Sequence, residues 1–304
     1  MTATSRAIGG RKKRRRWELF FVAFPLMCIV LVFNYVPLFG WALSVFEYKP
    51  GTPLTQNEFV GLKYFQMILN SKDIRRVLTN TMIFSGLNFV LMPLPMLFAI
   101  LLNEIQSTGF KKVTQTLTTL PHFISWIIVY SLAFAIFSTD GLLNTLLSML
   151  GMKQQKLLQD RNAVYPFQTF ISQWKSLGWN SIIYIAAITG IDQELYEAAA
   201  VDGAGKFRCA IHITLPGLMP TFLVVALLAV ANFINSGLDQ YFMFQNSVVM
   251  KNIEVIDLYT YRVGLKNQDY SYATAVGMCK SLISLVMLFV TNAIAKKVRG
   301  ESIV

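Results

Sequence analysis

Two asparagines and a phenylalanine interrupt an otherwise apolar run near residue 230. Asn232 and Asn235 are three residues apart, so they share one face if the run is helical, and Phe233 lies between them. An amide both donates and accepts hydrogen bonds, which suits a ligand rich in hydroxyl groups, and an aromatic ring can stack on such a ligand. The alternative is that the amides hydrogen-bond between packed helices. The chemistry indicated here is binding rather than bond cleavage.

A single lysine, Lys280, lies inside another apolar run, about two helical turns from its start and so roughly 10 Å deep at 1.5 Å per residue. If that run spans a membrane, the charge costs about 1–3 kcal/mol unless the side chain extends to the surface or faces water. Both arrangements remain open. In the second, Lys280 faces a cavity and favours an acidic ligand.

Patterns typical of catalysis or metal binding are missing from the sequence. His122 and His212 have no cluster of cysteines or carboxylates around them, and the three cysteines have no spacing typical of a zinc site or a disulfide framework. Gly205-Lys206 is followed by Phe207, so there is no phosphate-binding loop. We therefore expect no catalytic residue, metal or cofactor, and any ATP has to be hydrolysed by a partner.

The composition is that of a polytopic membrane protein. The chain has 304 residues, of which 54% are hydrophobic and 14% charged, and the mean hydropathy is +0.49. A soluble domain carries about a quarter charged residues. The net charge of +11 comes from basic residues beside apolar runs, where they orient membrane spans, so nucleic-acid binding is excluded.

The most distinctive polar stretch lies between two apolar runs. Asp192 can cap a helix that contains three consecutive alanines, and Asp202-Gly203 permits a sharp turn after it. A second short helix is expected before Pro216 closes the stretch, with one apolar face formed by Phe207, Ile211 and Leu215. A helix–turn–helix of this kind is suited to docking into another protein.

This stretch resembles the "EAA" loop that marks the membrane-spanning subunits of binding-protein-dependent ABC importers. The pattern is Glu-Ala-Ala, three residues, Gly, nine residues and then Ile-x-Leu-Pro. The matching residues are Glu197, Ala198, Ala199, Gly203, Ile213, Leu215 and Pro216. The resemblance implies that residues 191–216, called the EAA loop below, form a coupling helix that docks the ATPase subunit.

Further boxes resemble the carbohydrate branch of these permeases, above all those for oligosaccharides derived from polysaccharides. They are residues 61–65, 120–126, 140–144 and 272–277. In sugar importers the stretch about 35 residues after the EAA glutamate contacts substrate. By this resemblance Asn232, Phe233 and Asn235 are substrate-pathway candidates, and Lys280 is a further candidate because of its depth in the last apolar run.

The resemblance also implies an architecture and a set of partners. The fold is expected to be an all-α membrane protein with six transmembrane helices, the type I ABC importer permease (MetI-like) fold, and a cytoplasmic coupling helix. The expected partners are a second homologous permease, two ATP-binding cassette ATPase subunits, an extracytoplasmic solute-binding protein and an oligosaccharide substrate. The location implied is the bacterial cell membrane.

Apolar runs place six spans along the chain, with bends expected at Pro25 and Pro37 in the first span and a break at Pro93 and Pro95 in the second. The expected spans are residues 19–44, 78–102, 116–138, 165–190, 217–237 and 273–295. Residues 140–160 carry leucines on one helical face and predict a helix on the outer membrane surface. Residues 238–271 are expected to be an outer loop.

The domain organisation follows from these spans. Residues 1–18 form a basic cytoplasmic N-terminus, residues 19–295 one transmembrane domain, and residues 296–304 a cytoplasmic tail. Lysine and arginine are denser in the segments that this topology places inside, which favours both termini in the cytoplasm, although Arg75 and Arg76 lie on the opposite side.

One competing function is a secondary transporter or channel that works without an ATPase. Such a protein is expected to carry Asp or Glu deep in its spans for ion coupling, and none of the six runs has one. A membrane enzyme lacks its catalytic set, and a scaffold subunit leaves the polar residues of the fifth span unexplained.

Overall fold

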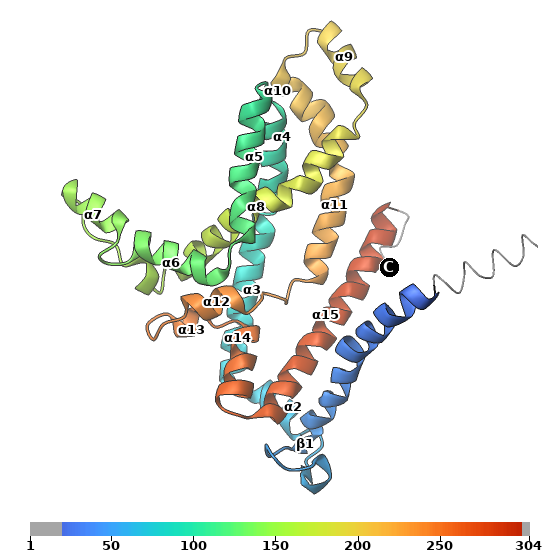
Figure 1. The fold of residues 1–304 in the computed structure, drawn as a ribbon, viewed down its shortest axis with the longest axis vertical. Helices are drawn as coiled ribbons and strands as arrows, with labels where there is room; N and C mark the ends of the chain where they lie inside the picture. Colours follow the sequence, from blue (N-terminus) through green and yellow to red (C-terminus); the bar gives the residue numbers. More distant parts are fainter. Residues whose placement is uncertain (1–19, 300–304) are drawn as a thin grey trace, which may run out of the picture. The chain divides into compact units, whose positions relative to one another are not determined.

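The computed structural model describes residues 20–299, so the basic N-terminal cluster and the last five residues of the tail lie outside it. The chain divides into two compact units. One consists of Met1–Ile68 and Val263–Met278, and the other of Leu69–Arg262 and Cys279–Val304. Within the described residues nearly all regular structure is helical (Figure 1).

The first unit begins with the predicted first span, a helical stretch at Phe20–Val45. Its geometry changes to a π-helix at η1 (Leu31–Tyr35) and to a 3-10 helix at η2 (Val36–Val45), which has Pro37 in its first turn. The change of helix type therefore falls at Pro37, the position of a predicted bend. A two-stranded antiparallel ladder, β1 (Phe46–Glu47) and β2 (Glu58–Phe59), and the 3-10 turn η3 (Leu54–Gln56) follow. Helix α2 (Lys63–Asn70) comes next.

The second unit starts with α3 (Lys72–Val90) and α4 (Pro93–Asn103). The predicted break in the second span is confirmed, because α3 ends before the proline pair and Pro93 opens α4. A proline fits the first turn of a helix, where its missing N–H has no partner to lose.

The third predicted span, 116–138, is wrong as one continuous helix. The chain forms α5 (Thr108–Phe123) and α6 (Trp126–Phe137) with a break between them. Lys175 of α8 explains the break: its side chain is buried, and Nζ donates hydrogen bonds to the carbonyl oxygens of Pro121, His122 and Ile124 at 2.7–2.9 Å. A cation at the last carbonyls of a helix satisfies groups that a continuous helix would use internally.

Helix α7 (Leu142–Met149) confirms the helix expected after residue 140, and the 3-10 turn η4 (Leu157–Gln159) follows it. Leu142, Leu146 and Leu150 are exposed, as expected for a face that lies on a membrane. Asn144 is buried and holds the following loop, since its amide donates to the carbonyl oxygens of Ser138 and Gln155.

Helix α8 (Val164–Thr189) is the centre of the second unit and packs against α4 and α5 (Figure 1). A β-carbon on Gly178 would lie 2.3 Å from the backbone of Thr118, so the two helices touch through a glycine. Five helical stretches in the described part are long and apolar enough to cross a membrane. They are Phe20–Val45, Lys72–Asn103, Trp126–Met149, Lys206–Ala231 and Tyr270–Lys296. Helix α8 has the length but, with its polar side chains, not the hydropathy, so the six-span count is only partly confirmed.

The outer loop predicted at residues 238–271 is instead folded. It forms α12 (Asp239–Phe244), α13 (Met250–Ile253), α14 (Ile256–Tyr261) and the π-helix η6 (Arg262–Lys266). Buried residues of this region, among them Val249, Ile253 and Leu258, join a core with α3, α6 and α8. The last helix, α15 (Tyr270–Arg299), contains the predicted sixth span.

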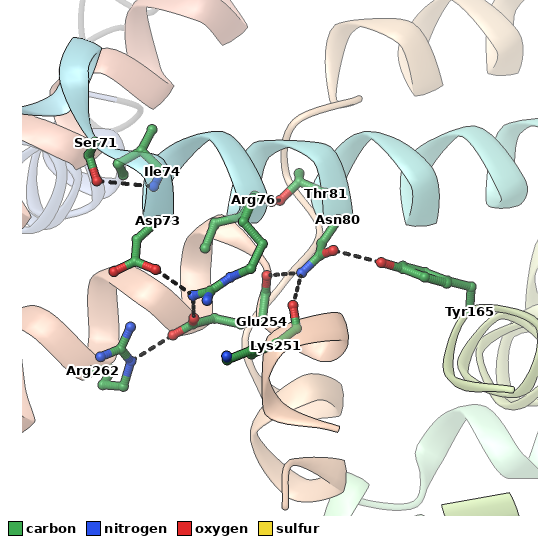
Figure 2. A network of polar contacts seen from close by, with 11 residues as sticks. Ser71, Asp73, Ile74, Arg76, Asn80, Thr81, Tyr165, Lys251, Glu254 and Arg262 are labelled. Atoms are coloured by element: carbon green, nitrogen blue, oxygen red, sulfur yellow. Dashed lines mark hydrogen bonds and ion pairs between the residues drawn. The ribbon is translucent and has the colours of Figure 1, made fainter. Parts of the chain in front are cut away.

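A buried carboxylate fixes this folded region to α3 (Figure 2). Glu254 is 1% exposed and pairs with Arg76 at 2.8 Å and with Arg262 at 2.6 Å. Asn80 of α3 donates to the carbonyl oxygens of Lys251 and Glu254 and accepts from the hydroxyl of Tyr165. As a surface charge, Arg76 would count against the predicted topology. It instead pairs with the buried Glu254, a partner that the sequence pattern did not indicate.

Candidate functional site

The EAA loop begins with α9 (Gln193–Val201), and Asp192 caps it as predicted by accepting a hydrogen bond from the backbone N–H of Glu194 at 3.0 Å. The helix ends in a Schellman motif. Gly203 N–H donates to the Ala200 carbonyl at 3.1 Å, and Ala204 N–H donates to the Ala199 carbonyl at 2.8 Å. Gly203 has φ +71°, the left-handed conformation that this motif requires at its glycine position.

The expectation that Pro216 closes the loop is wrong. Helix α10 (Lys206–Cys209) continues through the π-helix η5 (Ala210–Thr214) into α11 (Leu215–Ala231), so the stretch Lys206–Ala231 is helical throughout. Pro216 lies in the first turn of α11. The Leu215 N–H bonds to the Ala210 carbonyl across five residues, so the π-helix changes the bonding pattern just before the proline.

The EAA loop presents apolar and charged groups to solvent. Val201 is 88% exposed and Phe207 79% exposed, and Glu197 is also exposed. Leu215 instead packs against the core cluster around Leu218, and the hydroxyl of Tyr196 hydrogen-bonds to that of Thr214 at 2.9 Å. The hydrogen bond between Tyr196 and Thr214 thus links α9 to the helix that follows it. The C-terminal end of α9, at Val201, and the start of α10, at Phe207, remain exposed to solvent.

A cavity of about 620 Å³ lies among α3, α8, α11 and α12 of the second unit. Its polar lining is rich in amides, namely Asn88, Gln173, Asn180, Asn232, Asn235 and Gln240, and its aromatic lining consists of Phe89, Trp179, Tyr184, Phe233 and Tyr241. None of the described lining residues carries a charge. Uncharged amides and aromatic rings are groups suited to contacts with hydroxyl-bearing rings.

Three of the four predicted pathway residues line this cavity: Asn232, Phe233 and Asn235. The prediction that the two asparagines share a helix face is wrong, because α11 ends at Ala231 and Asn232 is its C-cap. The following residues form a turn, in which the Asn235 N–H bonds to the Asn232 carbonyl at 2.9 Å. The amide of Asn232 donates back to the Leu228 carbonyl, so helix termination rather than helix continuation brings these side chains to the cavity.

Lys280 is not among the residues that line the cavity. Its ammonium group contacts the carboxylate of Asp257 on α14, and both side chains are about one-fifth exposed. This arrangement matches neither a side chain that extends to the surface nor one that faces the cavity. The pathway role of Lys280 stays a prediction.

Helix α8 supplies lining residues that the sequence interpretation did not assign. Gln173 donates to the side-chain oxygen of Asn88 at 2.9 Å, which links α8 to α3 in the cavity wall. Trp179 stacks face to face on His122 with ring centroids 4.4 Å apart. The sequence feature that could have indicated these lining residues is the high content of amide and hydroxyl side chains in the fourth apolar run. A helix that faces lipid on all sides does not tolerate so many polar side chains.

The described residues contain no group of three or more His, Cys, Asp or Glu side chains placed to hold a metal ion.

Comparisons with known proteins give a consistent picture. The family model described as "Binding-protein-dependent transport system inner membrane component" matches residues 91–300. Protein LplB of Bacillus subtilis (strain 168) is 36% identical over 96% of this chain and 92% of its own length. The polygalacturonan/rhamnogalacturonan transport system permease protein YteP of the same organism is 36% identical over 94% of this chain and 89% of its own.

A solved structure of similar fold is a chain of a bacterial alginate ABC transporter in complex with an alginate pentasaccharide-bound periplasmic protein. It superposes with a TM-score of 0.87 at 30% sequence identity and covers 96% of this chain and 99% of its own. The similarity therefore extends over both compact units and is not confined to the EAA loop.

Proposed function

Because the chain belongs to the family of inner membrane components of binding-protein-dependent transport systems, we propose that it forms half of the translocation pathway of an ATP-driven oligosaccharide importer. Members of this family are permease subunits of ABC transporters and not enzymes. The observation that carries the carbohydrate assignment is the cavity of about 620 Å³, whose uncharged amide and aromatic lining suits sugar rings.

The relatives support this substrate class. Their names describe these relatives as transport proteins for polygalacturonan and rhamnogalacturonan, for arabinooligosaccharides, and for alginate. These sugars differ in charge, but all of them carry hydroxyl groups on their rings. Amides such as Asn232 and Asn235 bind hydroxyls whether or not the sugar also carries a carboxylate. The proposed substrate is therefore an oligosaccharide, bound in this subunit through its hydroxyl groups.

The proposed assembly contains a second homologous permease, two ATPase subunits and an extracytoplasmic solute-binding protein. Both termini and the EAA loop face the cytoplasm. The exposed Val201 and Phe207 fill an apolar cleft of the ATPase, and Glu197 pairs with a basic group beside it. Ala198 and Ala199 keep the α9 surface small enough for close approach, whereas Ile213, Leu215 and Pro216 connect the loop to α11.

In this mechanism the ATPase dimer moves the EAA loop when it closes on ATP. The motion reaches the cavity directly, because Lys206–Ala231 is one helical stretch and its C-cap, Asn232, lines the cavity. Rigid-body rotation of the permease subunits then opens the cavity to the binding protein. When the ATPase dimer opens again, the cavity opens to the cytoplasm.

The test is reconstitution of the complete complex in liposomes with its binding protein. We expect uptake and stimulated ATP hydrolysis with at least one labelled oligosaccharide from a panel of arabinooligosaccharides, galacturonate oligomers and alginate oligomers. Uptake of a panel member that does not depend on ATP would contradict the proposal, as would an ATPase that no panel member stimulates.

Asn235→Leu provides a site-specific test. Loss of one hydrogen bond to a neutral ligand costs about 0.5–1.5 kcal/mol, so the half-saturating substrate concentration should rise about two- to tenfold. The matched control is Gln154→Leu, which removes an exposed amide outside the cavity. Equal kinetics for both variants would show that Asn235 only packs in the cavity wall.

A further inference from the structure

The residues between α11 and α12 form a short segment on which the cavity depends. Residues 232–237, called the cavity segment, have no regular helix, yet Asn232, Phe233, Asn235 and Ser236 all line the cavity. Ile234 is not among the lining residues and is fully buried. The position of this segment therefore decides where four potential ligand contacts lie.

The far end of the cavity segment is attached to Asp257. The backbone N–H of Gly237, which has φ +79°, donates a hydrogen bond to Oδ2 of Asp257 at 3.1 Å. The other carboxylate oxygen, Oδ1, contacts the ammonium group of Lys280. One carboxylate thus joins the cavity segment, α14 and α15, and all three residues belong to the same compact unit.

Each partner needs the other for a physical reason. Asp257 and Lys280 are mostly shielded from solvent, with side chains 21% and 20% exposed. A carboxylate in such a place is stable when an opposite charge compensates it, and removal of one partner leaves the other charge uncompensated. Without Lys280, Asp257 is expected to turn toward water and to release the Gly237 N–H.

We infer that Asp257 and Lys280 are positioning residues for the cavity segment, and that Lys280 influences substrate through Asp257 rather than by touching it. The expected effect on uptake rests on the proposed function. The expected effect on the position of the cavity segment does not require any substrate. Positioning of the cavity segment also gives a role to the lysine inside the apolar run of α15.

The two roles of Lys280 make opposite predictions for a double variant. Lys280→Met alone leaves a shielded carboxylate without its cation. Adding Asp257→Asn removes that charge but keeps a side-chain oxygen that accepts from Gly237. If Lys280 acts through Asp257, Lys280→Met/Asp257→Asn should restore what Lys280→Met loses. If Lys280 contacts substrate directly, the second change cannot restore it.

The first experiment measures hydrogen–deuterium exchange of peptides containing Gly237 in the assembled complex without substrate. Lys280→Met should accelerate exchange about 10- to 150-fold, the effect of losing one hydrogen bond to a charged acceptor. Lys280→Arg and Lys280→Met/Asp257→Asn should stay near the native rate. Asp257→Ala, which has no acceptor, should exchange fast with or without Lys280→Met. Lys251→Met, which removes an exposed lysine of the same unit, is the control.

The second experiment measures uptake of whichever panel oligosaccharide the native complex transports. Lys280→Met should raise the half-saturating concentration about fivefold with the maximal rate retained, and Lys280→Met/Asp257→Asn should return it toward the native value. Unchanged exchange in Lys280→Met, or a double variant no better than the single one, would overturn the inference. If no panel member is transported, the proposed function fails, whereas the exchange experiment still decides the positioning role.

Discussion

Gly203 sets the shape of the EAA loop through its backbone rather than through contacts. Its φ of +71° closes the Schellman motif of α9, and nothing lies within 4 Å of a β-carbon built on it. Space is therefore available for a side chain, but the conformation is one that β-branched residues rarely adopt. The sequence pattern predicts a constrained glycine here, and the structure confirms its conformation.

Gly203→Val is expected to cost about 1–2 kcal/mol in the native loop conformation and to misplace α9 relative to α10. The permease should still insert in the membrane and assemble with its partner permease. Co-purification of the ATPase subunit and substrate-stimulated ATP hydrolysis should both fall. The matched control is Gly205→Ala, since Gly205 has an ordinary negative φ and also has nothing within 4 Å of its β-carbon. Stimulated hydrolysis at the native level in Gly203→Val would refute the role.

Lys175 illustrates a residue whose role only its surroundings reveal. Lys175→Met removes one donor group from three carbonyl oxygens at the end of α5, and an unsatisfied buried acceptor costs about 1–3 kcal/mol. We expect a clearly lower Tm of the detergent-purified complex. Lys153→Met, which changes an exposed lysine, should leave the Tm unchanged. A Tm of Lys175→Met equal to that of the native complex would show that water replaces the ammonium group.

At the scale of elements, the α12–α14 region is a folded helical segment fixed to α3 by Glu254 and Asn80. Burial alone would lower the pKa of Arg262, but the hydrogen bond and charge of Glu254 outweigh it, so the pKa is raised and the guanidinium stays charged. The same region contributes Gln240 and Tyr241 to the cavity. The shape of the cavity therefore also depends on the attachment of this region to α3.

Glu254→Gln is expected to destabilise the protein by about 2–3 kcal/mol, less than for a fully buried pair because both arginines remain partly exposed. The decrease should appear as a lower denaturant midpoint and as faster hydrogen exchange in α13 and α14. Asp73→Asn is the control, because that carboxylate pairs with Arg76 from a side chain that is 58% exposed. If both variants have the same midpoint, the buried charge does not hold the region in place.

At the scale of the whole molecule, the proposed topology places both termini and the EAA loop in the cytoplasm and α7 outside. In a cysteine-free background, a cysteine at Ser148 should react with a membrane-impermeant maleimide in intact cells. A cysteine at Lys206 should react only after the cells are permeabilised. Reaction of the Lys206 variant from outside would reverse the orientation and remove the ATPase-docking role of the EAA loop.

Local sequence features were enough to predict the membrane class, the EAA loop and its family, the prolines that break the second span, and the cap at Asp192. These features are local, because hydropathy, helix caps and proline geometry depend on residues close in the chain. The match to inner membrane components of binding-protein-dependent transport systems confirms the interpretation that these features supported.

Features that depend on residues far apart in the chain became visible only in the folded protein. The break between α5 and α6 needs Lys175 from another helix, and the folding of residues 238–271 needs the buried charges of Glu254, Arg76 and Arg262. The end of α11 at Ala231 likewise moved Asn232 and Asn235 from a helix face into a turn beside the cavity. A lysine or glutamate looks the same in the sequence whether it meets solvent or a partner, and only the packed helices decide which of the two it meets.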